Sequence, residues 1–364
     1  MRTMLSVGGN PYSKTEAPAD ELIFGSVDGV ALLSRSGQEW QVQHRALEGL
    51  HVSSLADDAR SGITFAGTHN GGLHASRDGG KSWLRRSNGI AEDEVYSLAV
   101  AEAGDQVRVY AGTEPAHLYV STDLGETWTD LPGVTQVGDT DAWTFPAPPH
   151  IAHTKFITTD PRNPDTIYAC IEQGALVRST DAGKSFQVIF DASAKDAHRI
   201  TIPPTQPDRL YLTRGDWSSG FEGIYLSTDG GANWDRLFDR SLIGYPDATL
   251  IHPDRPELIF VAGATGSPNV WGKMGNAGTH VARSRDGGKS WQSLSGIPPA
   301  GALGNVEAMA MNFWPGGFAI FAGTTDGDIY CSQDEGESWT TIARGLPAIS
   351  KAGHWRWKQR MVAA

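Results

Sequence analysis

Four histidines are the first candidates for chemistry, because each lies at or near the beginning of a segment that alternates apolar and polar residues like a β-strand. They are His51, His153, His198 and His354. A neutral imidazole can bind a divalent or redox metal ion, and it can also act as a general acid or base. If these strands begin around one axis, we expect the four imidazoles to hold a metal ion or to exchange protons with a substrate.

Carboxylates and guanidinium groups in or near similar strand-like segments complete the candidate site. Glu94, Asp247 and Glu307 could orient the histidines or act as the general base, and Arg199 could act beside them on a substrate carboxylate. Arg214 is a second candidate for binding the substrate. Three tryptophans in the long segments between strands could close over this group and restrict it to a small substrate: Trp143, Trp217 and Trp271.

Polar residues occupy the starts of nearly all these strand-like segments. They could therefore form a polar ring without any chemistry, which is a second interpretation. They include Tyr96, Lys155, Asp196 and Asn305. Buried ionisable groups need partners or a ligand. A mixed ring of charges can satisfy itself, or can face water, without any chemistry.

A repeated motif indicates how these segments are arranged. The motif, called here the box motif, reads Ser-x-Asp-x-Gly-x-x-Trp and recurs with spacings of 45 to 58 residues. The six copies are SRDGGKSW from Ser76, STDLGETW from Ser121, STDAGKSF from Ser179, STDGGANW from Ser227, SRDGGKSW from Ser284 and SQDEGESW from Ser332. A shorter copy without the Asp, SRSGQEW, begins at Ser34.

Short apolar strands precede each box motif and another follows its Trp, so each repeat predicts four strands with the box at the turn between the third and fourth. Four-stranded units at this period are typical of a β-propeller. We therefore expect an all-β chain forming a single seven-bladed propeller over residues 1–364. The expected blades are residues 20–50 plus 350–362, 51–93, 94–149, 150–195, 196–244, 245–304 and 305–349.

The box motif resembles the Asp-box, or bacterial neuraminidase repeat, of the sialidase-like superfamily. The resemblance covers almost the whole chain and implies a propeller in which the box is a folding device. It does not imply one activity, because such propellers include sialidases, xyloglucanases, sortilin-type receptors and photosystem assembly factors.

The first expected blade lacks an innermost strand, and the C-terminal end offers a candidate. Residues 353–362, GHWRWKQRMV, place His354 and Arg356 on one face and two tryptophans on the other. We expect this segment to close the ring against residues 22–26. A solvated basic tail is the alternative interpretation.

Long insertions and histidines both favour the end of the propeller opposite the box motifs. The insertions at residues 132–150 and 263–279 belong to that end, as do nine of the 11 histidines. Loops that lengthen on one face of a rigid scaffold commonly carry the binding function.

Three functions follow from these residues. The first is a metal-assisted or His-dependent enzyme, a hydrolase or lyase, acting on a small polar or anionic substrate, with the identity of the metal left open. The second is a non-catalytic propeller that binds proteins or assists assembly. The third is a sialidase-like glycosidase, although Arg199, Arg214 and Arg356 do not follow the family order and sialidases have six blades. A xyloglucanase needs two opposed carboxylates across paired propellers, and this chain has room for one propeller.

Composition excludes other classes. The net charge of −12 disfavours nucleic acid and acidic membranes as partners. Cys170 and Cys331 cannot form a disulfide framework. The first residues lack the apolar run of a secretion signal, and no segment has the length of a membrane span. We expect a cytoplasmic protein; its substrate and its oligomeric state are not specified by these patterns.

Overall fold

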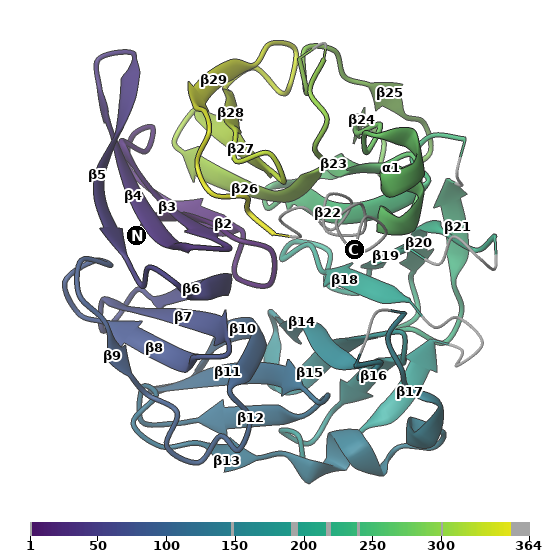
Figure 1. The fold of residues 1–364 in the computed structure, drawn as a ribbon. Coiled ribbons are helices and arrows are strands. Elements are labelled where there is room, and N and C mark those ends of the chain that lie inside the picture. The colour runs from purple at the N-terminus through teal and green to yellow at the C-terminus, as the bar shows by residue number, and fades with distance from the viewer. Residues whose placement is uncertain are drawn as a thin grey trace, which may run out of the picture.

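Seven sheets form a closed ring in the computed structural model, which describes residues 2–146, 149–190, 196–215, 220–238, 241–299 and 301–350. Figure 1 shows the sheets arranged around one axis, in chain order from purple to yellow. The prediction of a seven-bladed β-propeller with four-stranded blades is confirmed. No helix in the described ranges is long and apolar enough to cross a membrane.

Each blade is one sheet whose strands are numbered outward from the axis. Blade 1 contains β1 (Thr3–Leu5), β3 (Glu21–Ser26), β4 (Gly29–Ser36) and β5 (Glu39–Ala46). Blade 2 contains β6 (His51–Asp58), β7 (Ile63–His69), β8 (Gly72–Ser76) and β9 (Leu84–Arg85). Blade 3 contains β10 (Glu94–Ala103), β11 (Gln106–Glu114), β12 (Leu118–Ser121) and β13 (Thr129–Asp130).

The remaining blades repeat this order. Blade 4 contains β14 (His153–Asp160), β15 (Asn163–Glu172), β16 (Leu176–Ser179) and β17 (Gln187–Phe190). Blade 5 contains β18 (Ala197–Thr201), β19 (Leu210–Arg214), β20 (Gly223–Ser227) and β21 (Asp235–Phe238). Blade 6 contains β22 (Tyr245–His252), β23 (Arg255–Ala264), β24 (His280–Ser284) and β25 (Gln292–Ser293). Blade 7 contains β26 (Val306–Trp314), β27 (Gly317–Thr324), β28 (Ile329–Ser332) and β29 (Thr340–Ala343), with β2 (Tyr12–Lys14) added on its inner side.

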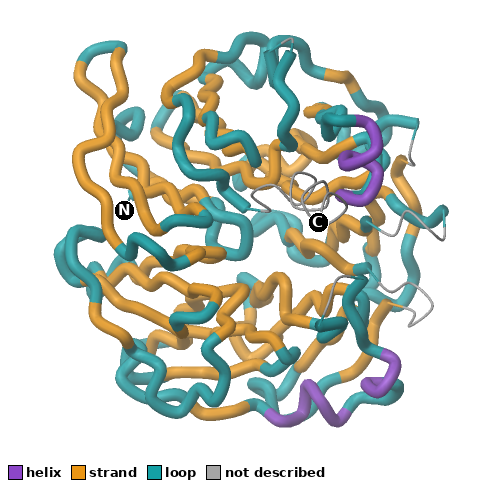
Figure 2. The backbone as a smooth tube through the Cα atoms, in the orientation of Figure 1, coloured by secondary structure: helices purple, strands orange, loops and turns teal. Residues whose placement is uncertain are grey.

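Three short helices interrupt the loops. The 3-10 helices η1 (Pro132–Gln136) and η2 (Thr140–Ala142) lie in the insertion between blades 3 and 4. The α-helix α1 (Pro268–Met274) lies in the insertion between β23 and β24 of blade 6. Figure 2 shows how little helix the tube contains beside its strands.

The box motif builds the turn between the third and fourth strands through one carboxylate and one hydroxyl. In the first box, Asp78 accepts hydrogen bonds from the Ser82 amide at 2.9 Å and the Ser82 hydroxyl at 2.6 Å. The Ser76 hydroxyl donates to Asp78 at 2.8 Å and accepts from the amide of Gly80 at 2.8 Å. Gly80 has φ +90°, a conformation that glycine adopts without strain. The box residues therefore stabilise the fold, as the sequence indicates.

Apolar side chains fill the space between neighbouring blades. Between blades 6 and 7, Leu250 and Phe260 pack with Met309 and Ile320 in one buried cluster. Similar clusters join the other blades, so each sheet buries both of its faces against its neighbours.

The N-terminal segment supplies the innermost described strand of blade 1. Residues Thr3–Leu5 pair in parallel with Leu22–Phe24 of β3, whose other edge pairs with β4. The expected pairing of residues 353–362 with residues 22–26 is therefore wrong, because both edges of that strand are occupied. His354 and the rest of residues 351–364 lie outside the described part of the chain. A parallel inner strand at the N-terminus escaped the sequence analysis because three residues carry no readable alternation.

After β1 the chain crosses the inside of the ring. The amide of Gly8 donates to Ser53 in blade 2, and the amide of Leu98 in blade 3 donates to Gly8. β2 then runs parallel to Met311–Phe313 of blade 7. A Cβ at Gly9 would lie 1.9 Å from the carbonyl oxygen of Leu55, so the segment approaches blade 2 more closely than a larger residue allows. The N-terminal segment thus bonds to the inner strands of several blades (Figure 1).

Leu5→Ala tests the role of β1. Leu5 is fully buried between blades 1 and 7, so we expect the substitution to lower the free energy of unfolding by about 2–5 kcal/mol. Leu84→Ala is the control, because Leu84 is 66% exposed and its loss should cost under about 0.5 kcal/mol. Chemical denaturation measures both values, and equal stabilities of the two variants would contradict the placement of β1.

Asp229→Asn tests the box motif through pH. Hydrogen bonds from Asn233 and Ser227 lower the pKa of Asp229 to about 2. The carboxylate therefore stabilises the fold fully above its unfolded pKa near ~4, and this contribution is lost as the pH falls toward about 2. We expect Asp229→Asn to melt below the parent at pH 7 and the difference to shrink below pH ~4. The exposed Asp235→Asn is the control, and a pH-independent difference for Asp229→Asn would refute this account.

Candidate functional site

The inner strands begin at the end of the ring opposite the box motifs, and there each meets the last residue of its neighbouring strand. The register pairs the first residue of the inner strand with the final residue of the second strand in four consecutive blades. The pairs are His51 with His69, Glu94 with Glu114, His153 with Glu172, and Ala197 with Arg214. Two polar side chains per blade therefore face the axis in three of these four blades.

Glu172 lies at the centre of this group. Its Oε2 lies 2.8 Å from Nε2 of His153 and 3.1 Å from Nζ of Lys155. The other ring nitrogen of His153 lies 3.3 Å from Glu114. Lys155 also reaches Asp247 at 3.4 Å. Blades 3, 4 and 6 are thus connected by buried ion pairs.

His198 joins the group from blade 5. Its Nδ1 lies 2.9 Å from the carbonyl oxygen of Pro246, while its Nε2 lies 3.3 Å from Asp196 and 3.6 Å from Glu172. His198 is 1% exposed, Asp196 2% and Glu172 5%. We call His153, Lys155, Glu172, Asp196, His198 and Asp247 the inner cluster.

Burial and charge act in opposite directions on the titrating groups of the inner cluster. Burial alone would raise the pKa of Glu172, but Lys155, His153 and His198 hold it well below its usual range. Burial also disfavours the imidazolium of His153, yet hydrogen bonds with Glu114 and Glu172 raise its pKa. The pKa of His198 is raised as well, because Asp196 and Asp247 outweigh burial and the repulsion from Lys155. The carboxylates of the cluster therefore attract positive charge to both rings.

A stack of rings leads from blade 2 to the inner cluster. His51 contacts His69, which stacks on Tyr96, and Tyr96 stacks on His153, with ring centroids 4.1, 4.1 and 3.9 Å apart. Burial lowers the pKa of His51 to about 4. Burial, with repulsion from His51 and His153, holds the pKa of His69 well below its usual range. The two histidines of blade 2 are therefore neutral at pH 7.

The structure brings together part of the expected site. His153, His198 and Asp247 lie in the inner cluster, whereas His51 belongs to the ring stack. Glu94 lies 3.9 Å from His69. Glu307 accepts a hydrogen bond from Asn305 at 2.7 Å in blade 7.

The expected substrate-binding residues are dispersed. The guanidinium of Arg199 donates to the carbonyl of Val7 and lies 4.1 Å above the Phe156 ring, so it holds the N-terminal segment. Arg214 lies beside the rings of Phe190 and Phe221. The two arginines thus contact different groups, unlike the convergent set of a sialidase.

The tryptophans also differ from expectation. Trp271 is fully buried in α1 and donates to Gly266 at 2.5 Å, so the expectation that it closes over a substrate is wrong. Its hydrophobic partners are residues of blade 6 and its insertion, among them Tyr245. Trp143 packs partly buried against the core between blades 3 and 4. Trp217 lies outside the described residues.

Sequence reasoning missed Glu114 and Glu172, and it counted His69 among the nine histidines of this end without placing it in the candidate site. All three are the final residue of a second strand, one position beyond the small residues in ITFAGT, VRVYAGT and TIYACI. Reading both strands of each antiparallel pair, instead of the inner strand alone, would have found them.

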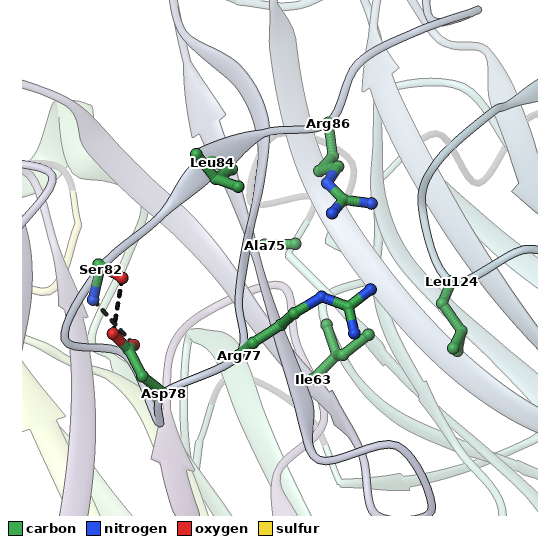
Figure 3. A pocket seen from close by; sticks show the side chains of 8 residues that line it. All are labelled: Ile63, Ala75, Arg77, Asp78, Ser82, Leu84, Arg86 and Leu124. Carbon is green, nitrogen blue, oxygen red and sulfur yellow. Dashed lines mark hydrogen bonds between the residues drawn. The ribbon is translucent and has the colours of Figure 1, made fainter.

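A small hollow of about 150 Å³ lies elsewhere, on the outer side of blades 2 and 3. Figure 3 shows Arg77 and Arg86 extending into it, with Asp78 held by Ser82 at its edge. It shares no residue with the inner cluster.

The fold and this end of the ring define a single seven-bladed propeller with a buried cluster of imidazoles and carboxylates. No family model matches the chain. It is 29% identical over 198 residues to a probable oligoxyloglucan-reducing end-specific xyloglucanase of Neosartorya fischeri, covering 51% of this chain and 20% of that protein. A xyloglucanase of Hypocrea jecorina is 22% identical over 77% of this chain and 37% of its own length. The chain thus spans between about a fifth and two fifths of these curated relatives.

Solved structures agree on the fold. An ancestral GH74 enzyme superposes with a TM-score of 0.62 at 17% identity, covering 80% of this chain and 38% of that one. YCF48 from Cyanidioschyzon merolae gives a TM-score of 0.51 at 14% identity, covering 78% and 83%. At these identities the likeness establishes the propeller architecture alone.

Titration of His51 tests the ring stack. Because burial lowers its pKa to about 4, the neutral stack contributes fully to stability above the unfolded pKa near ~6.5, and this contribution is lost as the pH falls toward about 4. We expect the ring resonances of ¹⁵N-histidine-labelled protein to show His51 neutral at pH 6, with assignment by His51→Gln. The exposed His44 is the reference. A midpoint for His51 near 6.5 would contradict the stack.

Proposed function

We propose that the chain is a hydrolase whose reaction centre is the inner cluster, with His153 and Glu172 as its acid–base pair. The supporting observation is the 2.8 Å contact between Nε2 of His153 and Oε2 of Glu172, with Glu114 at 3.3 Å from the opposite ring nitrogen. A ring between two carboxylates has one orientation and a raised pKa, which suits a group that gives and takes protons near neutral pH.

The relatives support the reaction class of this proposal. Two of the similar proteins are named as xyloglucanases, and these enzymes hydrolyse glycosidic bonds. The proposed substrate is a small polar or anionic molecule, with short oligosaccharides as the first class to test. Membership of the Asp-box propellers is part of the proposal, and the carboxylate–hydroxyl turn of the box motif supports it. The two free, buried cysteines fit the proposed cytoplasmic location.

A non-catalytic binding propeller is the second candidate, and burial favours it. His153 is 3% exposed and Lys155 7%, and both are engaged with Glu172. A buried network whose members satisfy one another can serve the fold alone. The two candidates differ in what removing the ring of His153 does to turnover.

His153→Gln separates them. We expect the parent to hydrolyse at least one substrate of a panel containing xyloglucan oligosaccharides, sialosides and small carboxylate or phosphate esters. Loss of a general acid–base group should then lower the kcat of the folded variant by about 10²-fold or more, although its melting temperature falls because Glu172 loses a buried partner. Asp229→Asn is the control, because it loosens a box motif and should keep the kcat of the folded protein.

Two results would overturn the hydrolase. One is a parent without turnover on the whole panel. The other is a folded His153→Gln variant with unchanged kcat. A parent without turnover, combined with a lower melting temperature for His153→Gln, would favour the binding propeller.

A further inference from the structure

His198 presents a ring nitrogen without a hydrogen bond to the interior of the inner cluster. Its Nδ1 lies 2.9 Å from the carbonyl oxygen of Pro246, which can only accept, so Nδ1 carries the hydrogen. In the neutral ring Nε2 then has a lone pair. This nitrogen is buried and forms no hydrogen bond with any described residue.

Two carboxylate oxygens face that lone pair. Oδ1 of Asp196 lies 3.3 Å from Nε2 of His198, and Oε1 of Glu172 lies 3.6 Å from it. Oδ1 of Asp196 is itself buried without a hydrogen bond from the described residues. Lone pairs at these distances repel one another unless a positive charge lies between them.

The two separations from Nε2 of His198 match the edges of a tetrahedral metal site. Two ligands at about 2.1 Å from an ion, at the tetrahedral angle, are about 3.4 Å apart. The observed 3.3 and 3.6 Å agree with this value. All three ligand atoms of Glu172, Asp196 and His198 lie within 4.8 Å of one another.

Neighbouring groups hold the three ligand side chains in the orientations that a metal site requires. His153 and Lys155 hold Oε2 of Glu172, so Oε1 is directed to His198. Pro246 fixes the tautomer of His198, as a backbone carbonyl commonly does for a ligating histidine. Gly215 leaves room for the ring, because a Cβ there would lie 2.1 Å from Cε1 of His198.

We propose that Glu172, Asp196 and His198 bind one divalent first-row transition ion of the Zn²⁺ type. One imidazole and two carboxylates suit such an ion, and three protein ligands leave a fourth position for water or substrate. A role for the ion in hydrolysis rests on the proposed function, whereas its binding does not. The expected ligand set of His51, His153, His198 and His354 thus keeps one member, His198, and gains two carboxylates.

A proton on Nε2 of His198 is the competing explanation of the same geometry. It would supply the positive charge to Oδ1 of Asp196 at 3.3 Å and to Oε1 of Glu172 at 3.6 Å, and it would leave no lone pair on Nε2 for an ion. The proton and the ion therefore make different predictions for metal binding.

Calorimetric titration of the full chain with Zn²⁺, after treatment with a chelator, tests the site. We expect one Zn²⁺ per chain, a tetrahedral absorption spectrum with Co²⁺, and no heat with Mg²⁺, which prefers oxygen ligands. Asp196→Asn keeps the shape of the side chain and should weaken binding at least tenfold. His198→Gln should abolish it.

Glu307→Gln is the matched control, because Glu307 is a buried carboxylate at the same end of the ring but outside the three ligands. It should bind Zn²⁺ like the parent. Circular dichroism confirms that each variant is folded. Absence of stoichiometric Zn²⁺ binding, or equal affinity in Asp196→Asn and the parent, would overturn the metal site.

The outcomes also separate this site from the proposed hydrolase. Zn²⁺ binding without turnover would leave the site standing and overturn the hydrolase. Turnover in chelator-treated protein that binds no Zn²⁺ would overturn the metal site and leave the hydrolase standing.

Discussion

The innermost strands of the blades begin around one axis, and this geometric constraint determines what the inner end of the propeller contains. Residues 153, 172, 198 and 247 come from three blades, yet their side chains lie within ion-pair distance of one another. All four side chains are buried at this end of the ring. Charges that would be dispersed on an open sheet are therefore concentrated in a small buried volume, where each needs a counter-charge.

Such a cluster is costly to bury and sensitive to the loss of any member. Glu172 is the shared partner of His153, Lys155 and His198, so its carboxylate links both rings to the ammonium. Removing one partner of a buried ion pair typically costs about 3–5 kcal/mol, because the other charge is left without compensation. A fold that keeps these charges instead of an apolar core of the same volume depends on their mutual compensation.

Features of the fold that depend on a repeated pattern could be predicted from the sequence. Features that depend on a single tertiary contact could not. The box motifs indicated the number of blades because six copies carry the Asp and Gly that the turn requires, and a shorter copy without the Asp marks the seventh. The positions of His153, His198 and Asp247 followed from the starts of inner strands. Glu172 was missed because it lies on the second strand, and register pairs it with His153 across the sheet. The parallel pairing of β1 could not be read, since it depends on a tertiary contact of three residues.

The crossing of the ring by the N-terminal segment has a consequence for biosynthesis. The residues of β2 find their partners in β26, about 300 residues later in the chain, because Tyr12–Lys14 pair with Met311–Phe313. At typical elongation rates of about 5–20 residues per second, β2 waits roughly 15–60 seconds before this partner exists. The ring can therefore close only after β26 has been synthesised, and until then β2 must avoid other open sheet edges.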